Sequence, residues 1–171
     1  MSTTGTNLEL IRRPRVALLG GVVVLTGALI LLLVRTAHPG ELPVSDRTVN
    51  ASTPISQPVY VGVFSAGAEF ARTLDLSGVK VHTTSNTEVS VTPLLCKAGT
   101  VGVTTDPDAF CAELVNPEGQ AFTSGDSIVL QVTSDEAAIA VIDRVRLGFR
   151  EGFQWGTLPA GQSAIVRVLA R

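Results

Sequence analysis

The sequence predicts an all-β protein, an immunoglobulin-like antiparallel β-sandwich of about seven or eight strands, preceded by one N-terminal transmembrane helix. Three observations support this prediction. Residues 16–34 are uncharged and almost wholly aliphatic. Beyond residue 58, short segments alternate apolar with polar side chains, which is the period of a half-buried strand. Turn-forming pairs such as Ser77-Gly78 and Ser124-Gly125 separate these segments.

The apolar segment 16–34 has the length of a membrane-spanning helix. At 1.5 Å per residue it extends about 28 Å, close to the roughly 30 Å hydrocarbon core of a bilayer. Three arginines (12, 13 and 15) precede it and one, Arg35, follows it. The positive-inside rule therefore predicts a cytoplasmic tail at 1–15 and places the following residues outside the cell. A cleaved signal peptide is the alternative, which the length of the run and Arg35 disfavour.

The segment 35–57 is predicted to be an extracytoplasmic linker. It contains three prolines (39, 43 and 54) among Ser, Thr, Asn and Asp, and it has few large apolar residues. Such a composition favours an extended spacer without secondary structure. The β-sandwich domain is then expected to occupy residues 58–171.

Strands are expected where the alternation is clearest, and the segment 108–115 is predicted to be either a strand or one helical turn. The longest predicted strand, 138–150, places three arginines on one face. The expected strands cover residues 59–64, 78–83, 88–92, 127–133, 138–150 and 163–169.

Cys96 and Cys111 both lie in the predicted outer domain. A pair of cysteines in an oxidising compartment usually forms a disulfide. A redox-active pair would favour CxxC spacing, and a zinc site would need further Cys or His ligands nearby. The sequence therefore predicts a structural disulfide.

The candidate binding residues are Arg144, Arg146 and Arg150 on the long strand and Trp155 in the loop that follows it. Three arginines on one face suit an anionic polymer or the carboxylates of a partner protein. The alternative is a solvated face whose arginines pair with neighbouring acids. Trp155 is interpreted either as part of a binding loop or as a plug at the end of the core.

Composition limits the classes of function. From Glu41 onward the chain carries 14 acidic and 9 basic residues, which argues against nucleic acid as a partner. No hydrolase, metalloprotease or nucleotide-binding motif is present, and we expect neither catalysis nor a cofactor or metal. Asp106, Asp108 and Glu113 could supply oxygen ligands to calcium, but they lack EF-hand spacing and are better explained by a turn.

From residue 58 to 168 the chain resembles uncharacterised actinobacterial single-pass membrane-anchored proteins that have a small extracytoplasmic β domain. The resemblance rests on Tyr60-Val-Gly, on residues 102–111 and on the segment 143–156, which runs from Asp143-Arg-Val-Arg to Gln154-Trp-Gly. It implies a location in the bacterial cell membrane and carries no site or activity.

These observations predict a membrane-anchored extracytoplasmic interaction or accessory module of the bacterial cell envelope, non-catalytic, with its C-terminal domain outside. Its expected partners are the lipid bilayer, through residues 16–34, and an unknown envelope protein or polymer. Two alternatives remain: an envelope hydrolase that uses a pair of carboxylates, and a subunit of a membrane complex that acts through its helix.

Overall fold

The computed structural model describes Gly27 and residues 39–170, and the latter belong to one compact unit, His38–Arg171. The predicted tail at 1–15 and, Gly27 apart, the predicted transmembrane helix at 16–34 lie outside the described residues. Within the part of the chain that the structure describes, no helix is long and apolar enough to cross a membrane.

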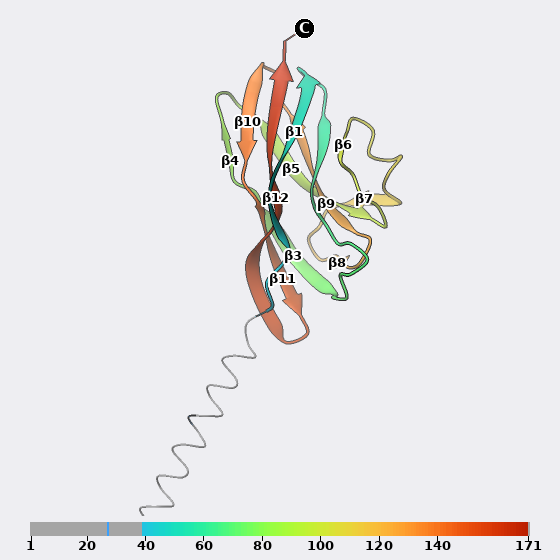
Figure 1. The fold of residues 1–171 in the computed structure, drawn as a ribbon. Coiled ribbons are helices and arrows are strands. Elements are labelled where there is room, and N and C mark those ends of the chain that lie inside the picture. The colour runs from blue at the N-terminus through green and yellow to red at the C-terminus, as the bar shows by residue number, and fades with distance from the viewer. Residues whose placement is uncertain (1–26, 28–38, 171) are drawn as a thin grey trace, which may run out of the picture. The chain divides into compact units, whose positions relative to one another are not determined.

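Residues 39–170 form twelve strands in two sheets that pack face to face (Figure 1), which confirms the predicted all-β sandwich. The strands exceed the seven or eight expected, because several, such as β6 and β8, have only two residues and give no alternation signal. One sheet has the order β4-β10-β12-β11-β3-β8, with β1 added beside β12, and the other has the order β6-β2-β9-β5-β7. The strands are β1 (Val44–Pro54), β2 (Val59–Ser65), β3 (Leu74–Lys80), β4 (Thr83–Ser85), β5 (Ser90–Lys97), β6 (Val103–Thr104), β7 (Glu113–Val115), β8 (Ala121–Phe122), β9 (Ser127–Thr133), β10 (Ala138–Ile142), β11 (Val145–Glu151) and β12 (Gln154–Leu169).

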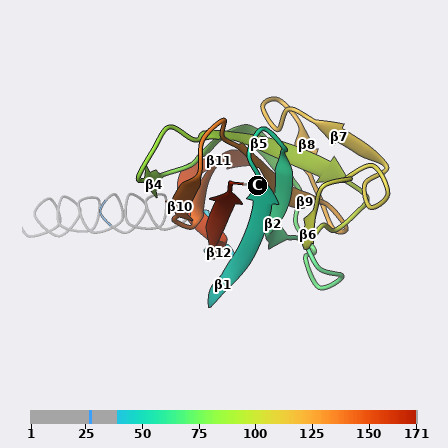
Figure 2. The ribbon, with the colours of Figure 1, turned by 90° about the horizontal axis from the view of Figure 1, so that it is seen from above.

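Strand β1 corrects two predictions, that of a linker without secondary structure at 35–57 and that of a domain beginning at residue 58, because residues 44–54 of that segment form a strand of the sandwich. It pairs in parallel with β12, from Thr48 opposite Ser163 to Pro54 opposite Leu169, and the two strands lie side by side in both ribbon views (Figure 2). Ala51 and Thr53 are buried, so the segment gains its stability from a partner more than 100 residues away. Pro54 is tolerated because β1 is an edge strand that pairs only with β12, so the missing N–H interrupts no second ladder.

The predicted strand 138–150 is interrupted, and Asp143 and Arg144 separate β10 from β11. The interruption changes which side chains face the core. Residues 138, 140 and 142 are buried in β10, whereas 145, 147 and 149 are buried in β11. Ile139 and Val141, which the uninterrupted alternation places on the apolar face, are therefore exposed. Because Asp143 and Arg144 are not part of either strand, the buried positions change from even-numbered residues in β10 to odd-numbered residues in β11.

The core between the sheets is aliphatic with one aromatic cluster. The rings of Phe64 and Phe122 stack with their centroids 5.3 Å apart, and Phe70 packs edge-on against both. Leu74, beside this cluster in β3, is completely buried. Burial of such apolar surface stabilises the fold by about 25 cal/mol per Å². Trp155 is not among the residues of this core.

The predicted disulfide between Cys96 and Cys111 is present and connects the end of β5 to the loop before β7. Both cysteines are buried, in a small cluster with Val101 and Val129. The bond therefore links the loop between β6 and β7 to β5 and so to the five-stranded sheet.

Replacing Cys96 and Cys111 together with alanine is expected to lower the free energy of unfolding by about 3 kcal/mol, because the bond closes a 15-residue loop. Urea-dependent pulse proteolysis of the full-length chain measures the loss. Wild-type protein treated with reductant should show a similar loss, and a double variant as stable as the oxidised wild type would contradict the assignment.

Candidate functional site

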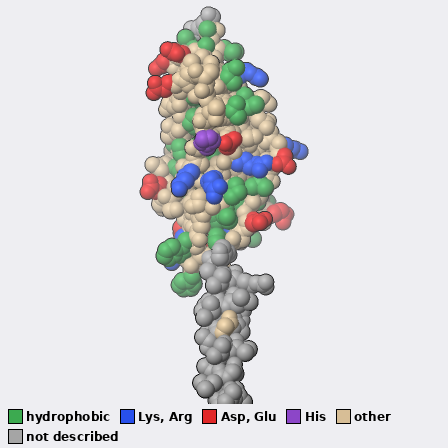
Figure 3. All heavy atoms as spheres, turned by 90° about the vertical axis from the view of Figure 1, so that its left-hand side faces the viewer, with side chains coloured by type: hydrophobic (Ala, Val, Ile, Leu, Met, Phe, Trp, Pro, Cys, Tyr) green, Lys and Arg blue, Asp and Glu red, His purple; other side chains and the backbone are tan. Residues whose placement is uncertain are grey.

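A polar hollow lies where β10 ends and β11 begins. The backbone N–H of Asp143 donates a hydrogen bond to the carbonyl oxygen of His82 at 3.0 Å, so the segment after β3 is fastened to the β10–β11 connection. The hollow has a volume of about 520 Å³ and is open to solvent. Figure 3 shows Lys and Arg side chains gathered on this face around a histidine, with an acidic side chain beside it. The lining residues are Lys80, Val81, His82, Asp143, Arg144, Arg146, Pro159 and Ser163.

Lys80 and Arg146 are directly opposite each other in the antiparallel pairing of β3 with β11. Arg146 donates from Nη2 to the carbonyl oxygen of Thr157 at 3.4 Å. Within residues 39–170, neither Lys80 nor Arg146 has an acidic partner within ion-pair distance. Like charges directly opposite one another destabilise a sheet. Stability of the fold therefore does not explain this pair of cations.

Arg144 adds a third cation at the rim of the hollow. Its Nε donates to the carbonyl oxygen of Ser45 at 3.2 Å, and its Nη2 forms an ion pair with the carboxylate of Asp46. Asp46 is fully exposed, and ion pairs of this kind contribute about 0–1 kcal/mol. An anion that enters the hollow can therefore compete with Asp46 at small cost.

The remaining charged groups of the hollow are His82 and Asp143. His82 Nε2 lies 4.0 Å from Asp143 Oδ2, and both side chains are largely exposed. Three permanent cations (Lys80, Arg144 and Arg146) thus face the carboxylate of Asp143, and Asp46, outside the lining, pairs with Arg144, in a domain whose overall charge is negative. The local excess of positive charge suits a carboxylate or phosphate group presented by a larger molecule, because guanidinium groups bind such anions in a bidentate geometry.

The structure divides the four predicted binding residues between two places. Arg144 and Arg146 meet at the hollow. Arg150 and Trp155 are opposite each other further along β11 and β12, beside the hairpin turn, where Arg150 Nε donates to the carbonyl oxygen of Gly152 at 2.7 Å. Trp155 is 74% exposed, so the interpretation of Trp155 as a plug of the core is wrong.

Lys80 and His82 are the members of the hollow that sequence reasoning did not assign to the site. The alternation of 78–83 places Lys80 and His82 on the same face of the predicted strand, so the sequence could have indicated that they lie together. The missing information was the register, since only the pairing of Arg146 with Lys80 brings the two strands' cations together.

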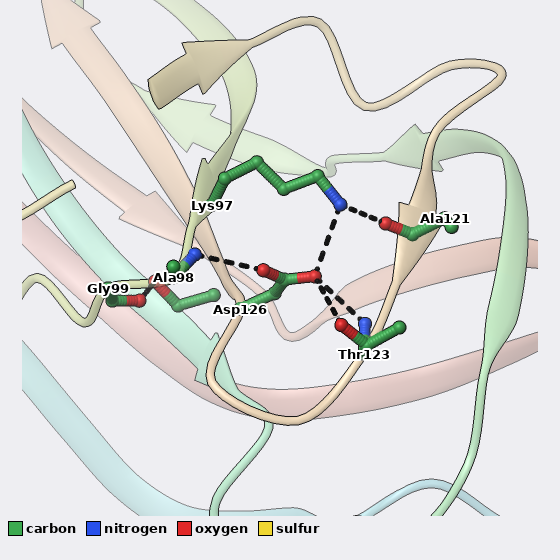
Figure 4. Close-up of polar contacts among 7 residues, drawn as sticks. Lys97, Ala98, Gly99, Ala121, Thr123 and Asp126 are labelled. Atoms are coloured by element: carbon green, nitrogen blue, oxygen red, sulfur yellow. Dashed lines mark hydrogen bonds and ion pairs between the residues drawn. The ribbon is translucent and has the colours of Figure 1, made fainter. Parts of the chain in front are cut away.

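A second polar cluster surrounds Asp126, which is 4% exposed (Figure 4). Its carboxylate accepts hydrogen bonds from the backbone N–H of Ala98 at 3.0 Å and of Thr123 at 2.9 Å, and from Lys97 Nζ at 3.2 Å. Burial raises the pKa of Asp126, but these hydrogen bonds and the charge of Lys97 outweigh it and the net pKa is lowered. Asp126 thus fastens the loops after β5 and β8 to the start of β9, and we assign it a structural role.

Among the described residues, no group of three or more His, Cys, Asp or Glu side chains is placed to hold a metal ion. The sequence candidates for calcium do not form such a group. Asp106 is instead held in a turn, where its backbone N–H and its carbonyl oxygen both hydrogen-bond to Thr104 Oγ1 at 3.0 Å.

Comparisons with protein families, curated proteins and solved structures gave no match to this chain. The hollow therefore has to be interpreted from its own residues.

Proposed function

We propose that this protein is a membrane-anchored, extracytoplasmic interaction module of the bacterial cell envelope, resembling actinobacterial proteins of that kind. In this proposal residues 16–34 hold it in the bilayer, and the hollow formed around Lys80, Arg144 and Arg146 binds carboxylate or phosphate groups of an envelope polymer or protein. The observation that carries the binding proposal is the cross-strand pair of Lys80 and Arg146, two like charges held opposite each other without an acidic partner among residues 39–170.

We also propose that the sandwich is immunoglobulin-like. In that fold, strands B, E and D share one sheet and strands C, F and G the other. Here β2, β9 and β5 are adjacent in that order and would correspond to strands B, E and D. In the other sheet β11 lies between β3 and β12, as strand F lies between strands C and G. The disulfide differs from the usual one, which joins strands B and F across the two sheets, because Cys96 and Cys111 connect β5 to a loop.

An interaction module explains the charged groups better than a carboxylate-based hydrolase does. A general acid of such an enzyme needs a raised carboxyl pKa. Glu151 has a lowered pKa, because Arg72 hydrogen-bonds to it, and the pKa of Asp126 is lowered as well. Both carboxylates are held in the charged form by fixed partners, which suits a structural role.

The binding proposal predicts the effect of removing the two unpaired cations. Lys80→Ala/Arg146→Ala should weaken binding of polygalacturonate or inorganic polyphosphate by about 10–100-fold, because each lost charge-assisted contact costs about 1.5–3 kcal/mol in full and less when water replaces it. Binding to the full-length protein in detergent, measured over a series of salt concentrations, should also show a shallower salt dependence for the variant.

Arg167→Ala is the matched control, since Arg167 is an exposed arginine of β12 that does not line the hollow. It should leave both affinity and salt dependence close to wild type. Equal weakening by the control and the double variant, or no binding of either polyanion by the wild type at low salt, would refute the hollow as an anion site.

A further inference from the structure

The hairpin that joins β11 to β12 exposes two large aromatic side chains next to its turn. Phe153 is 96% exposed and Trp155 is 74% exposed, the two highest values among the large hydrophobic residues described. Gly152 begins the turn with a φ of +58°, a left-handed conformation that favours glycine. Leaving such surface in water forgoes about 25 cal/mol per Å², and neither ring is needed in the core.

The chain enters the domain beside this hairpin. Pro39 lies against Gly156, so closely that a Cβ on Gly156 would be 2.7 Å from Cγ of Pro39. Leu42, three residues further on, is buried in the core. In Figure 1 the start of the coloured chain accordingly lies next to the hairpin formed by β11 and β12.

Arg72 fixes the incoming segment in this position. It donates from Nη1 to the carbonyl oxygen of Glu41 at 2.9 Å and from Nη2 to that of Gly40 at 3.1 Å. The same guanidinium binds both carboxylate oxygens of Glu151, at 2.9 and 2.6 Å, and lies over the ring of Phe149. The first residues of the domain and the end of β11 are therefore held together by one side chain.

The length of the tether limits how far the hairpin can lie from a bilayer. The predicted membrane helix ends at Val34, five residues before Pro39. Five residues span at most about 18 Å even when fully extended, and the headgroup layer accounts for about 5–7 Å of that distance on each side of the bilayer. Because Pro39 contacts the base of the hairpin, the aromatic tip is within reach of the lipid headgroups.

We propose that the β11–β12 hairpin is seated in the bilayer interface, with Phe153 and Trp155 inserted among the lipid headgroups. This inference rests on the proposed anchor at 16–34. Trp is enriched at membrane interfaces because its ring is amphipathic. The nearby charges are balanced, since Arg72 binds Glu151 and Arg150 is opposite Asp75. The contact is therefore aromatic in origin and does not require anionic lipid.

Trp155 is the single tryptophan of the sequence and so reports on its own position. The test uses the full-length chain in vesicles of phosphatidylcholine, with and without added phosphatidylglycerol. Flotation after alkaline extraction first establishes that the chain is in the membrane. Trp155 fluorescence should then be quenched by brominated phosphatidylcholine and protected several-fold from acrylamide, to the same extent in both kinds of vesicle.

The control moves the reporter to the other end of the domain. In Trp155→Phe/Ile139→Trp, the new tryptophan occupies an exposed position of β10, opposite Arg167 near the end of β12. It should be open to acrylamide and insensitive to brominated lipid. If Trp155 were as accessible to acrylamide as the control tryptophan in chains that float, the hairpin inference would be overturned and the anchor would not. A chain that fails to float would overturn the anchor and this inference with it.

Discussion

Replacing Asp126 with alanine is expected to lower the free energy of unfolding by about 3–5 kcal/mol, as removal of one partner from a buried ion pair does. The variant leaves the amide groups of Ala98 and Thr123 without their acceptor, and it removes the carboxylate from the ammonium group of Lys97, which keeps its hydrogen bond to the carbonyl oxygen of Ala121. Pulse proteolysis of the full-length chain across a urea series measures the change. Asp108→Ala, at an exposed position, should stay within about 0.5 kcal/mol of wild type.

The same interaction should make stability depend on pH in acid. The pKa of Asp126 in the folded protein is lowered, so its contribution is fully present above the unfolded value near 3.9 and is lost as the pH falls through the lower folded value. The stability difference between wild type and Asp126→Ala should therefore shrink below about pH 4. A difference that is small at pH 7, or that does not change in acid, would contradict this account.

Gly161→Ala is expected to cost about 3–5 kcal/mol or to prevent folding, because it combines backbone strain with overpacking. Gly161 has a φ of +69°, and a Cβ there would overlap the carbonyl oxygen of Val63 and lie 2.8 Å from Cβ of Phe64. Its N–H also donates to the carbonyl oxygen of Pro43 at 2.8 Å. Neither β2 nor the start of β1 can move away without losing its own pairing.

Gly119→Ala separates the two causes. Gly119 has a similar φ of +77°, but a Cβ there meets nothing within 4 Å. It should therefore show the conformational penalty alone, about 1–2 kcal/mol. The excess loss in Gly161→Ala measures the close approach of β12 to β2, and equal losses in the two variants would show that this approach has no energetic weight.

Parts of the fold were predictable because their signals are local. The alternation in 127–133 matches β9, and 59–64 matches β2 within one residue. The cysteines could be paired because the sequence has only two. Strand β1 could not be predicted, since most of its own residues are polar, its last residue is a proline, and its burial comes from β12. Sequence periodicity carries no information about such a distant partner.

The candidate site could also be predicted only in part. The arginines of β11 stand out in the sequence, but alternation alone extends one face through Arg144, Arg146 and Arg150. The interruption at Asp143 and Arg144 and the pairing of β3 with β11 decide which of them meet Lys80. Both depend on tertiary contacts, as does the exposure of Trp155, so the sequence could name candidates but not group them correctly.

The parallel pairing of β1 with β12 determines how the domain resists a mechanical pull. The chain that carries the proposed anchor leads into the beginning of β1, at Val44, whereas β12 finishes at Leu169. A force between these two points runs along the strands in opposite directions and shears the whole ladder, so its hydrogen bonds must fail together. Resistance to such a force is set by the rate of unfolding. A partner attached near the end of β12 would therefore load the β1–β12 ladder in shear, and its hydrogen bonds would not open one at a time.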